Sequence, residues 1–143
     1  MQNRIRVDHG FLYLLAILLL TIPLRWIAAS SLAGAFHELG HFAAVQLLDG
    51  HVSAVDFTLH GARMHVTPLC QRKQLFCLLA GPAASFFLML LWPIFPRVAL
   101  CGLAQGVYNL LPFGNQDGAQ ALRCLRGLFL TRKEKLLAKR VDR

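Results

Sequence analysis

The chain of 143 residues is 56% hydrophobic and only 15% charged, with a mean hydropathy of +0.51, whereas soluble domains average about 25% charged residues. This composition is typical of one membrane domain and excludes an ordinary soluble one. The net charge of +8 does not indicate a nucleic-acid partner, because eight of the 15 Lys and Arg residues follow Asp117 and no base-reading motif or aromatic–basic interleaving appears.

Four apolar segments are predicted along the chain, which we expect to form a single domain over residues 1–143. They cover residues 10–26, 30–48, 74–95 and 98–112, followed by a broken continuation at 117–130 and a basic tail at 131–143. Because a membrane-spanning helix needs about 20 residues, the second and third segments are long enough, whereas the fourth needs its continuation. We therefore expect an all-α integral membrane protein with about four transmembrane helices.

The distribution of positive charge predicts how these segments are oriented. If each segment crosses the bilayer, 13 of the 15 Lys and Arg residues lie on one side, and the positive-inside rule makes that side cytoplasmic. Both termini are then cytoplasmic, in a multi-pass protein of a bacterial inner or cell membrane. A cleaved signal peptide is the alternative for the first segment, because Arg4 and Arg6 precede it and small residues follow it at 28–30.

Residues 51–67, between the second and third segments, alternate apolar and polar side chains around His60-Gly61. Period-two alternation with a Gly-containing turn predicts a β-hairpin, and the charge distribution places this hairpin on the cytoplasmic side. In one interpretation it is a small loop at the membrane surface. In the other it is an edge that takes up an extended membrane-protein substrate by strand addition.

The second segment contains the run His37-Glu38-Leu39-Gly40-His41. On a helix, this spacing puts two imidazoles on one face beside a carboxylate, which is the pattern of a zinc site with its own general base. Of the seven acidic residues, only Glu38 and Asp117 fall at membrane depth, where an ionisable side chain needs a partner. Since catalytic zinc takes three protein ligands and a water, we predict His37, His41 and Asp117 as ligands. Hydrogen-bonded core histidines and a helix N-cap at Asp117 are the structural alternatives.

Three patches of the sequence together resemble the site-2 protease family of intramembrane zinc metalloproteases. They are the His-Glu run above, the run Asn109-Leu110-Leu111-Pro112-Phe113-Gly114-Asn115-Gln116-Asp117-Gly118, and the run Ala80-Gly81-Pro82-Ala83-Ala84-Ser85. The second fits the family's Asn-x-x-Pro-x-x-x-x-Asp-Gly pattern, and the third is similar to its Gly-Pro-x-x-Asn motif. The compact layout resembles the branch that includes the sporulation-factor-processing proteases.

The resemblance implies a zinc endopeptidase that cleaves transmembrane or membrane-associated proteins in the course of regulated intramembrane proteolysis. It implies one Zn²⁺ ion, held by His37, His41 and Asp117, which activates a water molecule. Glu38 would take the proton of that water and pass it to the leaving amine. A regulatory membrane partner is a further expectation.

The resemblance also makes Asn109 and Ser85 candidate substrate-binding residues. Ser85 stands where the family usually has Asn, and a hydroxyl has a shorter reach than an amide. Two other functions therefore stay open. One is a pseudoprotease that acts as a membrane scaffold or regulator, which only the serine at position 85 favours. The other is a metal transporter, which needs more polar groups through the helices than this chain offers.

Overall fold

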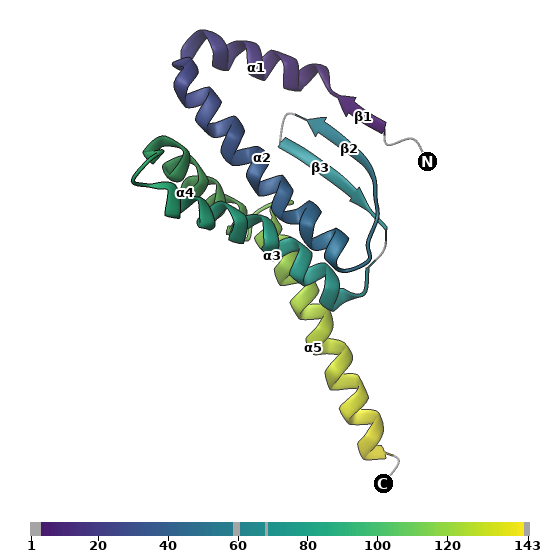
Figure 1. The fold of residues 1–143 in the computed structure, drawn as a ribbon. Helices are drawn as coiled ribbons and strands as arrows, with labels where there is room; N and C mark the ends of the chain where they lie inside the picture. Colours follow the sequence, from purple (N-terminus) through teal and green to yellow (C-terminus); the bar gives the residue numbers. More distant parts are fainter. Residues whose placement is uncertain (1–3, 59–60, 68, 142–143) are drawn as a thin grey trace.

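The computed structural model describes residues 4–58, 61–67 and 69–141, and it is mostly helical with one small sheet (Figure 1). The helices are α1 (His9–Thr21), α2 (Leu24–Leu47), α3 (Gln71–Phe87), the short 3-10 helix η1 (Leu88–Leu91), α4 (Pro96–Leu110) and α5 (Asp117–Val141). The strands are β1 (Arg4–Val7), β2 (Val52–Thr58) and β3 (Gly61–Val66). The expectation of a mainly helical fold with a hairpin between two long helices is confirmed.

The sheet has three strands in the order β1-β2-β3, one more than the predicted hairpin contains. β2 and β3 pair antiparallel as expected, with Val55 opposite Met64, while the expected turn at 59–60 lies outside the described residues. β1 pairs in parallel with β2, with Ile5 opposite Val55. The N-terminal strand and the segment between α2 and α3 therefore lie side by side.

The boundary between the first two helices differs from the expectation. α1 ends at Thr21 and α2 begins at Leu24, so the apolar segment expected over 10–26 is broken before its end. The cause is Pro23, which disfavours a helical conformation in the preceding residue, and Ile22 is extended with φ −115° and ψ 136°. With 13 residues, α1 is about 20 Å long, which is shorter than a hydrocarbon core of about 30 Å.

Helix length and composition single out one stretch of the described chain, Gln71–Leu91, as long and apolar enough to cross a membrane. It comprises α3 and η1 and corresponds to the third predicted segment. Leu12–Thr21 in α1 is apolar but shorter. Length and composition together thus support one crossing in the described chain, whereas the sequence predicts about four.

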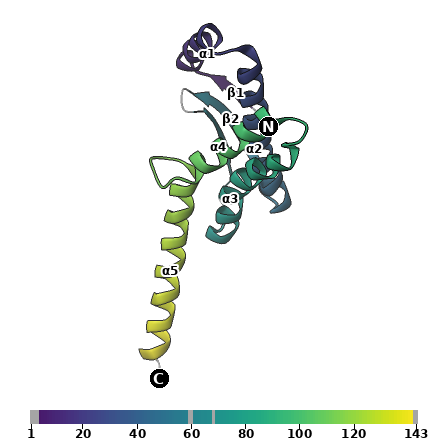
Figure 2. The same ribbon diagram turned by 90° about the vertical axis from the view of Figure 1, so that its left-hand side faces the viewer.

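The basic tail expected at 131–143 continues α5 as a helix as far as Val141. Lys, Glu, Leu and Ala, which are good helix formers, make up much of this stretch. Figures 1 and 2 show α5 extending away from the other helices, with its first turns beside them. Asp117, the first residue of α5, therefore lies among the helices while the far end of α5 projects from them.

Small residues line the contacts among α2, α3 and α4. α2 buries Ala29, Ala33 and His37, which are spaced four residues apart and so share one face. A Cβ added at Gly102 on α4 would lie 2.8 Å from the carbonyl oxygen of Ser85 on α3. Such close approach of helix backbones is typical of packing through small residues, and it brings side chains from separate helices into one site.

Large apolar side chains point away from these contacts. Leu20 and Leu47 are 87% and 83% exposed, whereas the largest fully buried side chains in the described part of the chain are Val45, Pro82 and Ser85. Water-soluble domains bury large aliphatic and aromatic residues preferentially. This protein therefore presents an apolar outer surface around a core of small residues.

Candidate metal centre

His37 and His41 lie on one face of α2, as their spacing predicts. Their Nε2 atoms are 3.1 Å apart, and the ring centroids are separated by 4.8 Å. The side chain of His37 is 3% exposed and that of His41 is 15% exposed. α3 packs over the second ring at Gly81, where an added Cβ would collide with the His41 imidazole. The glycine therefore leaves the room that this ring occupies.

Asp117 reaches the two histidines from the first turn of α5. Its Oδ2 atom lies 3.2 Å from Nε2 of His37 and 3.2 Å from Nε2 of His41. The next residue is Gly118, where an added Cβ would collide with the carbonyl oxygen of Leu110. Glycine thus lets α5 begin directly against the end of α4. The structure brings the three predicted ligands together.

Hydrogen bonds to the opposite ring atoms orient both imidazoles. His41 Nδ1 donates to the backbone carbonyl of Cys77 at 2.7 Å, and His37 Nδ1 lies 2.9 Å from the hydroxyl oxygen of Ser85. A carbonyl oxygen only accepts, so the proton of neutral His41 is on Nδ1 and its Nε2 keeps a lone pair. The Ser85 hydroxyl can accept from His37 in the same way. Ligating histidines are usually held by such a bond from the non-ligating nitrogen.

The three ligand atoms form a nearly equilateral triangle with sides of 3.1, 3.2 and 3.2 Å. Bonds to zinc of about 2.0–2.1 Å at tetrahedral angles put ligand atoms about 3.4 Å apart, so the triangle is close to the size that a metal ion requires. Three lone pairs at this separation repel one another unless a proton or a cation lies among them. His37, His41 and Asp117 can therefore hold a metal ion.

Ser85 is connected to the metal-binding triangle through His37. Its side chain is fully buried on α3, at 0% exposure, and its hydroxyl oxygen lies 2.9 Å from Nδ1 of His37. Ser85 therefore lies behind one of the three predicted metal ligands. The expectation that Ser85 binds substrate stays a prediction.

Asn109 and Glu38 border the triangle without belonging to it. The side-chain Nδ2 of Asn109, at the end of α4, lies 3.3 Å from Nε2 of His37. Glu38 is partly buried on α2 and follows His37 directly in the chain. Among the described residues, Glu38 is not in the group whose ligand atoms converge. These positions suit an amide donor and a proton acceptor beside a metal ion.

One contributor to the site escaped the sequence analysis, namely the carbonyl of Cys77. A backbone acceptor leaves no side-chain signature, but Pro82 in the interior of α3 is an indirect signal. Proline has no N–H to donate to the carbonyl four residues earlier, at Leu78, and Cys77 is the residue before Leu78. The Gly81-Pro82 pair thus makes room for the His41 ring and lies next to its backbone acceptor.

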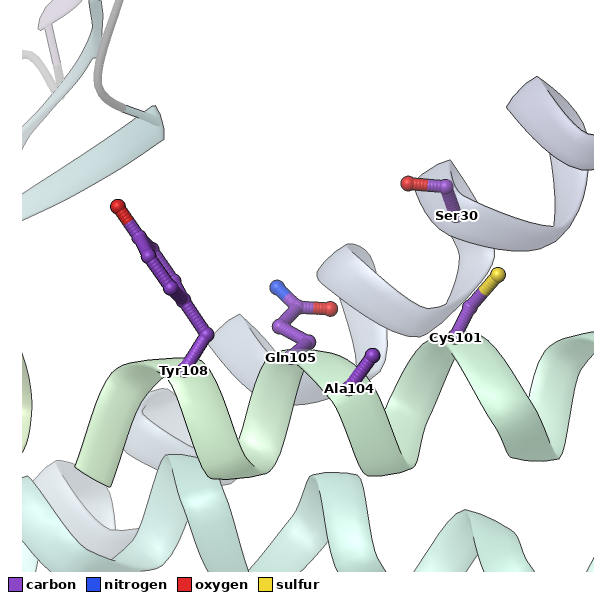
Figure 3. A pocket seen from close by; sticks show the side chains of 5 residues that line it. All are labelled: Ser30, Cys101, Ala104, Gln105 and Tyr108. Atoms are coloured by element: carbon purple, nitrogen blue, oxygen red, sulfur yellow. The ribbon is translucent and has the colours of Figure 1, made fainter. Parts of the chain in front are cut away.

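A shallow groove lies between α2 and α4. It is lined by Ser30 on α2 and by Cys101, Ala104, Gln105 and Tyr108 on α4 (Figure 3). None of these residues is one of the three predicted ligands. The helices that line the groove also carry residues of the site, since Tyr108 precedes Asn109 on α4.

No protein-family model matches this chain, and no curated protein matches it either. The described fold and site define a mostly helical protein with a His-His-Asp group that can hold a metal ion.

Proposed function

We propose that this protein is a zinc-dependent endopeptidase that hydrolyses peptide bonds of transmembrane or membrane-associated proteins. The observation that carries the proposal is the triangle of ligand atoms from His37, His41 and Asp117, with Glu38 beside it. Two imidazoles and one carboxylate are a ligand set of catalytic zinc, which leaves a position for water. The motifs that resemble the site-2 protease family support the same function.

Each neighbouring side chain has a role in this reaction. Bound zinc would supply a Lewis acid that acidifies a water molecule and polarises a carbonyl group. Glu38 accepts the proton of that water and donates it to the leaving amine. The Asn109 amide, whose Nδ2 lies 3.3 Å from the His37 Nε2 atom, would donate a hydrogen bond to the substrate oxygen.

A membrane location is part of the proposal, and the distribution of apolar side chains supports it. Leu20 and Leu47 are more than four-fifths exposed, while small residues fill the helix contacts. Such a surface is unfavourable in water and suited to lipid. α2 has 24 residues and is about 36 Å long, enough for a core of about 30 Å, and it carries His37 near its middle.

The pairing of β1 with β2 supports the proposed orientation. The charge distribution predicts that the N-terminus and residues 51–67 lie on the same, cytoplasmic side of the membrane. Parallel pairing of these two segments requires that they share a side. β1 covers one edge of β2, so an extended substrate that docks on residues 51–67 by strand addition would use the other edge of the hairpin, on β3.

The proposal is tested on protein purified in detergent. Elemental analysis identifies the metal, and this step matters because two histidines and a carboxylate also serve iron(II) in oxygenases. Cleavage of model transmembrane substrates is then measured before metal removal, after it, and after zinc is restored. We expect about one zinc ion per chain. Cleavage should be lost when the metal is removed and should return when zinc is restored.

The other outcomes would favour the alternatives. Bound zinc without cleavage of any substrate would favour a scaffold or regulator that keeps only the metal. Zinc flux into vesicles would favour a transporter, but the buried polar side chains in the described part of the chain are His37 and Ser85. These two are in mutual contact and form no pathway through the helices.

A further inference from the structure

Ser85 and His37 are hydrogen-bonding partners in a region closed to solvent. The Ser85 hydroxyl oxygen lies 2.9 Å from His37 Nδ1, and the two side chains are 0% and 3% exposed. Nδ1 is the ring atom on the far side from Nε2, which faces the metal-binding triangle. The serine therefore lies behind the His37 ring, on the side away from the metal-binding triangle.

We propose that Ser85 is a positioning residue for His37. Its hydroxyl oxygen accepts the Nδ1–H of His37, which leaves the lone pair of Nε2 free for the metal and holds the ring toward Asp117. The inference rests on the metal-dependent function proposed above and concerns how one of the three ligands is held. It assigns to Ser85 a role that differs from substrate binding.

His41 contacts a backbone carbonyl and His37 contacts a side-chain hydroxyl, so the effect of Ser85 on His37 can be tested without disturbing His41. His41 donates to the Cys77 carbonyl at 2.7 Å, and that acceptor belongs to the backbone. It is present whatever side chain occupies position 77. His37 relies instead on a side-chain hydroxyl that a substitution can remove. Loss of the hydroxyl is therefore expected to disturb His37 alone.

Close packing by α4 keeps the hydroxyl in place. A Cβ added at Gly106 would lie 3.2 Å from Ser85 Cβ, and one at Gly102 would lie 2.8 Å from the Ser85 carbonyl oxygen. Serine fits under this cover and reaches Nδ1. The close approach of α4 therefore leaves the Ser85 side chain little room to move.

The test compares zinc affinity, measured by competition with a chelator, in wild type and three variants. Ser85→Ala leaves the His37 Nδ1–H buried without an acceptor, and we expect zinc to bind about 10–100-fold more weakly. Ser85→Thr keeps the hydroxyl and should recover most of the affinity. Ser31→Ala removes an exposed hydroxyl from the same helix as His37 and should bind zinc as wild type does.

A second readout follows the histidine proton itself. In zinc-loaded protein labelled with ¹⁵N-histidine, the His37 Nδ1 proton should be slow to exchange with water in wild type and Ser85→Thr, and faster in Ser85→Ala. Equal zinc affinity in wild type and Ser85→Ala would overturn the inference. An equal loss of zinc affinity in Ser85→Ala and Ser85→Thr would also overturn it, because the loss would then come from altered packing and not from the missing hydroxyl. If wild type itself binds no zinc, the proposed function fails instead.

Discussion

Asp117 Oδ2 lies 3.2 Å from His37 Nε2, although 80 positions separate the two residues in the chain. The histidine is carried by α2 and the aspartate by the first turn of α5, and α3 packs against both helices. The ligand set is therefore complete only when these three helices are assembled. A metal ion bound by these residues would therefore stabilise the assembly of the three helices.

Replacement of Asp117 tests the ligand set. Asp117→Ala removes the single carboxylate of the triangle, and two imidazoles alone hold zinc poorly. We expect zinc affinity to fall by at least about 100-fold, beyond the 10–100-fold typical of residues that only support a ligand. Elemental analysis after dialysis at fixed free zinc measures the loss. Full zinc occupancy in this variant would mean that another residue is the third ligand.

Gly81 is predicted to be essential for the space around His41. A Cβ at this position would collide with the imidazole, so Gly81→Ala should displace the ring, weaken zinc binding and cost about 1–3 kcal/mol of stability through overpacking. Gly34→Ala is the matched control, because its Cβ would lie 3.6 Å from Gln105 Nε2, an ordinary contact. Thermal unfolding and zinc affinity report the two effects. Equal behaviour of the two variants would show that the His41 ring needs no such space.

Asn109 is predicted to act on the substrate rather than on the metal. Its side-chain Nδ2 lies 3.3 Å from His37 Nε2, and an amide N–H donates a hydrogen bond but does not ligate a metal ion. Asn109→Ala should therefore keep its zinc and lose about 10²–10³-fold in kcat, as when a donor to a developing oxyanion is removed. Loss of zinc in step with activity would instead make Asn109 a structural support of the metal site.

The ligands could be predicted from the sequence because their chemistry is distinctive. The spacing of His37 and His41 matches one helical turn, and an apolar environment leaves few structural reasons for Glu38 and Asp117. The hairpin was predicted by its alternating pattern, and β2 and β3 confirm it. These features could be predicted because each depends on a local sequence pattern or on an ionisable side chain that is unfavourable in an apolar environment.

Other features depend on contacts between distant segments. The four residues of β1 are too few to show a pattern from which the pairing strand could be predicted. Their parallel pairing with β2 is visible only in the folded chain. The contact of Ser85 with His37 spans 48 positions and depends on how closely α4 approaches α3. Resemblance to a family motif singled out Ser85, but a sequence motif does not show which side chain it contacts in the folded chain.

The central claim is metal-assisted peptide hydrolysis with Glu38 as the general base. Cleavage of a model transmembrane substrate by zinc-matched wild type and Glu38→Gln tests it most directly, because glutamine keeps the size of the side chain but cannot accept the proton. Asp49→Asn, which changes a carboxylate that is 95% exposed, is the control and should cleave as wild type does. We predict equal zinc content in all three proteins. The cleavage rate should fall about 10²–10⁴-fold in Glu38→Gln and should not change in Asp49→Asn. Undiminished cleavage by Glu38→Gln would contradict the claim.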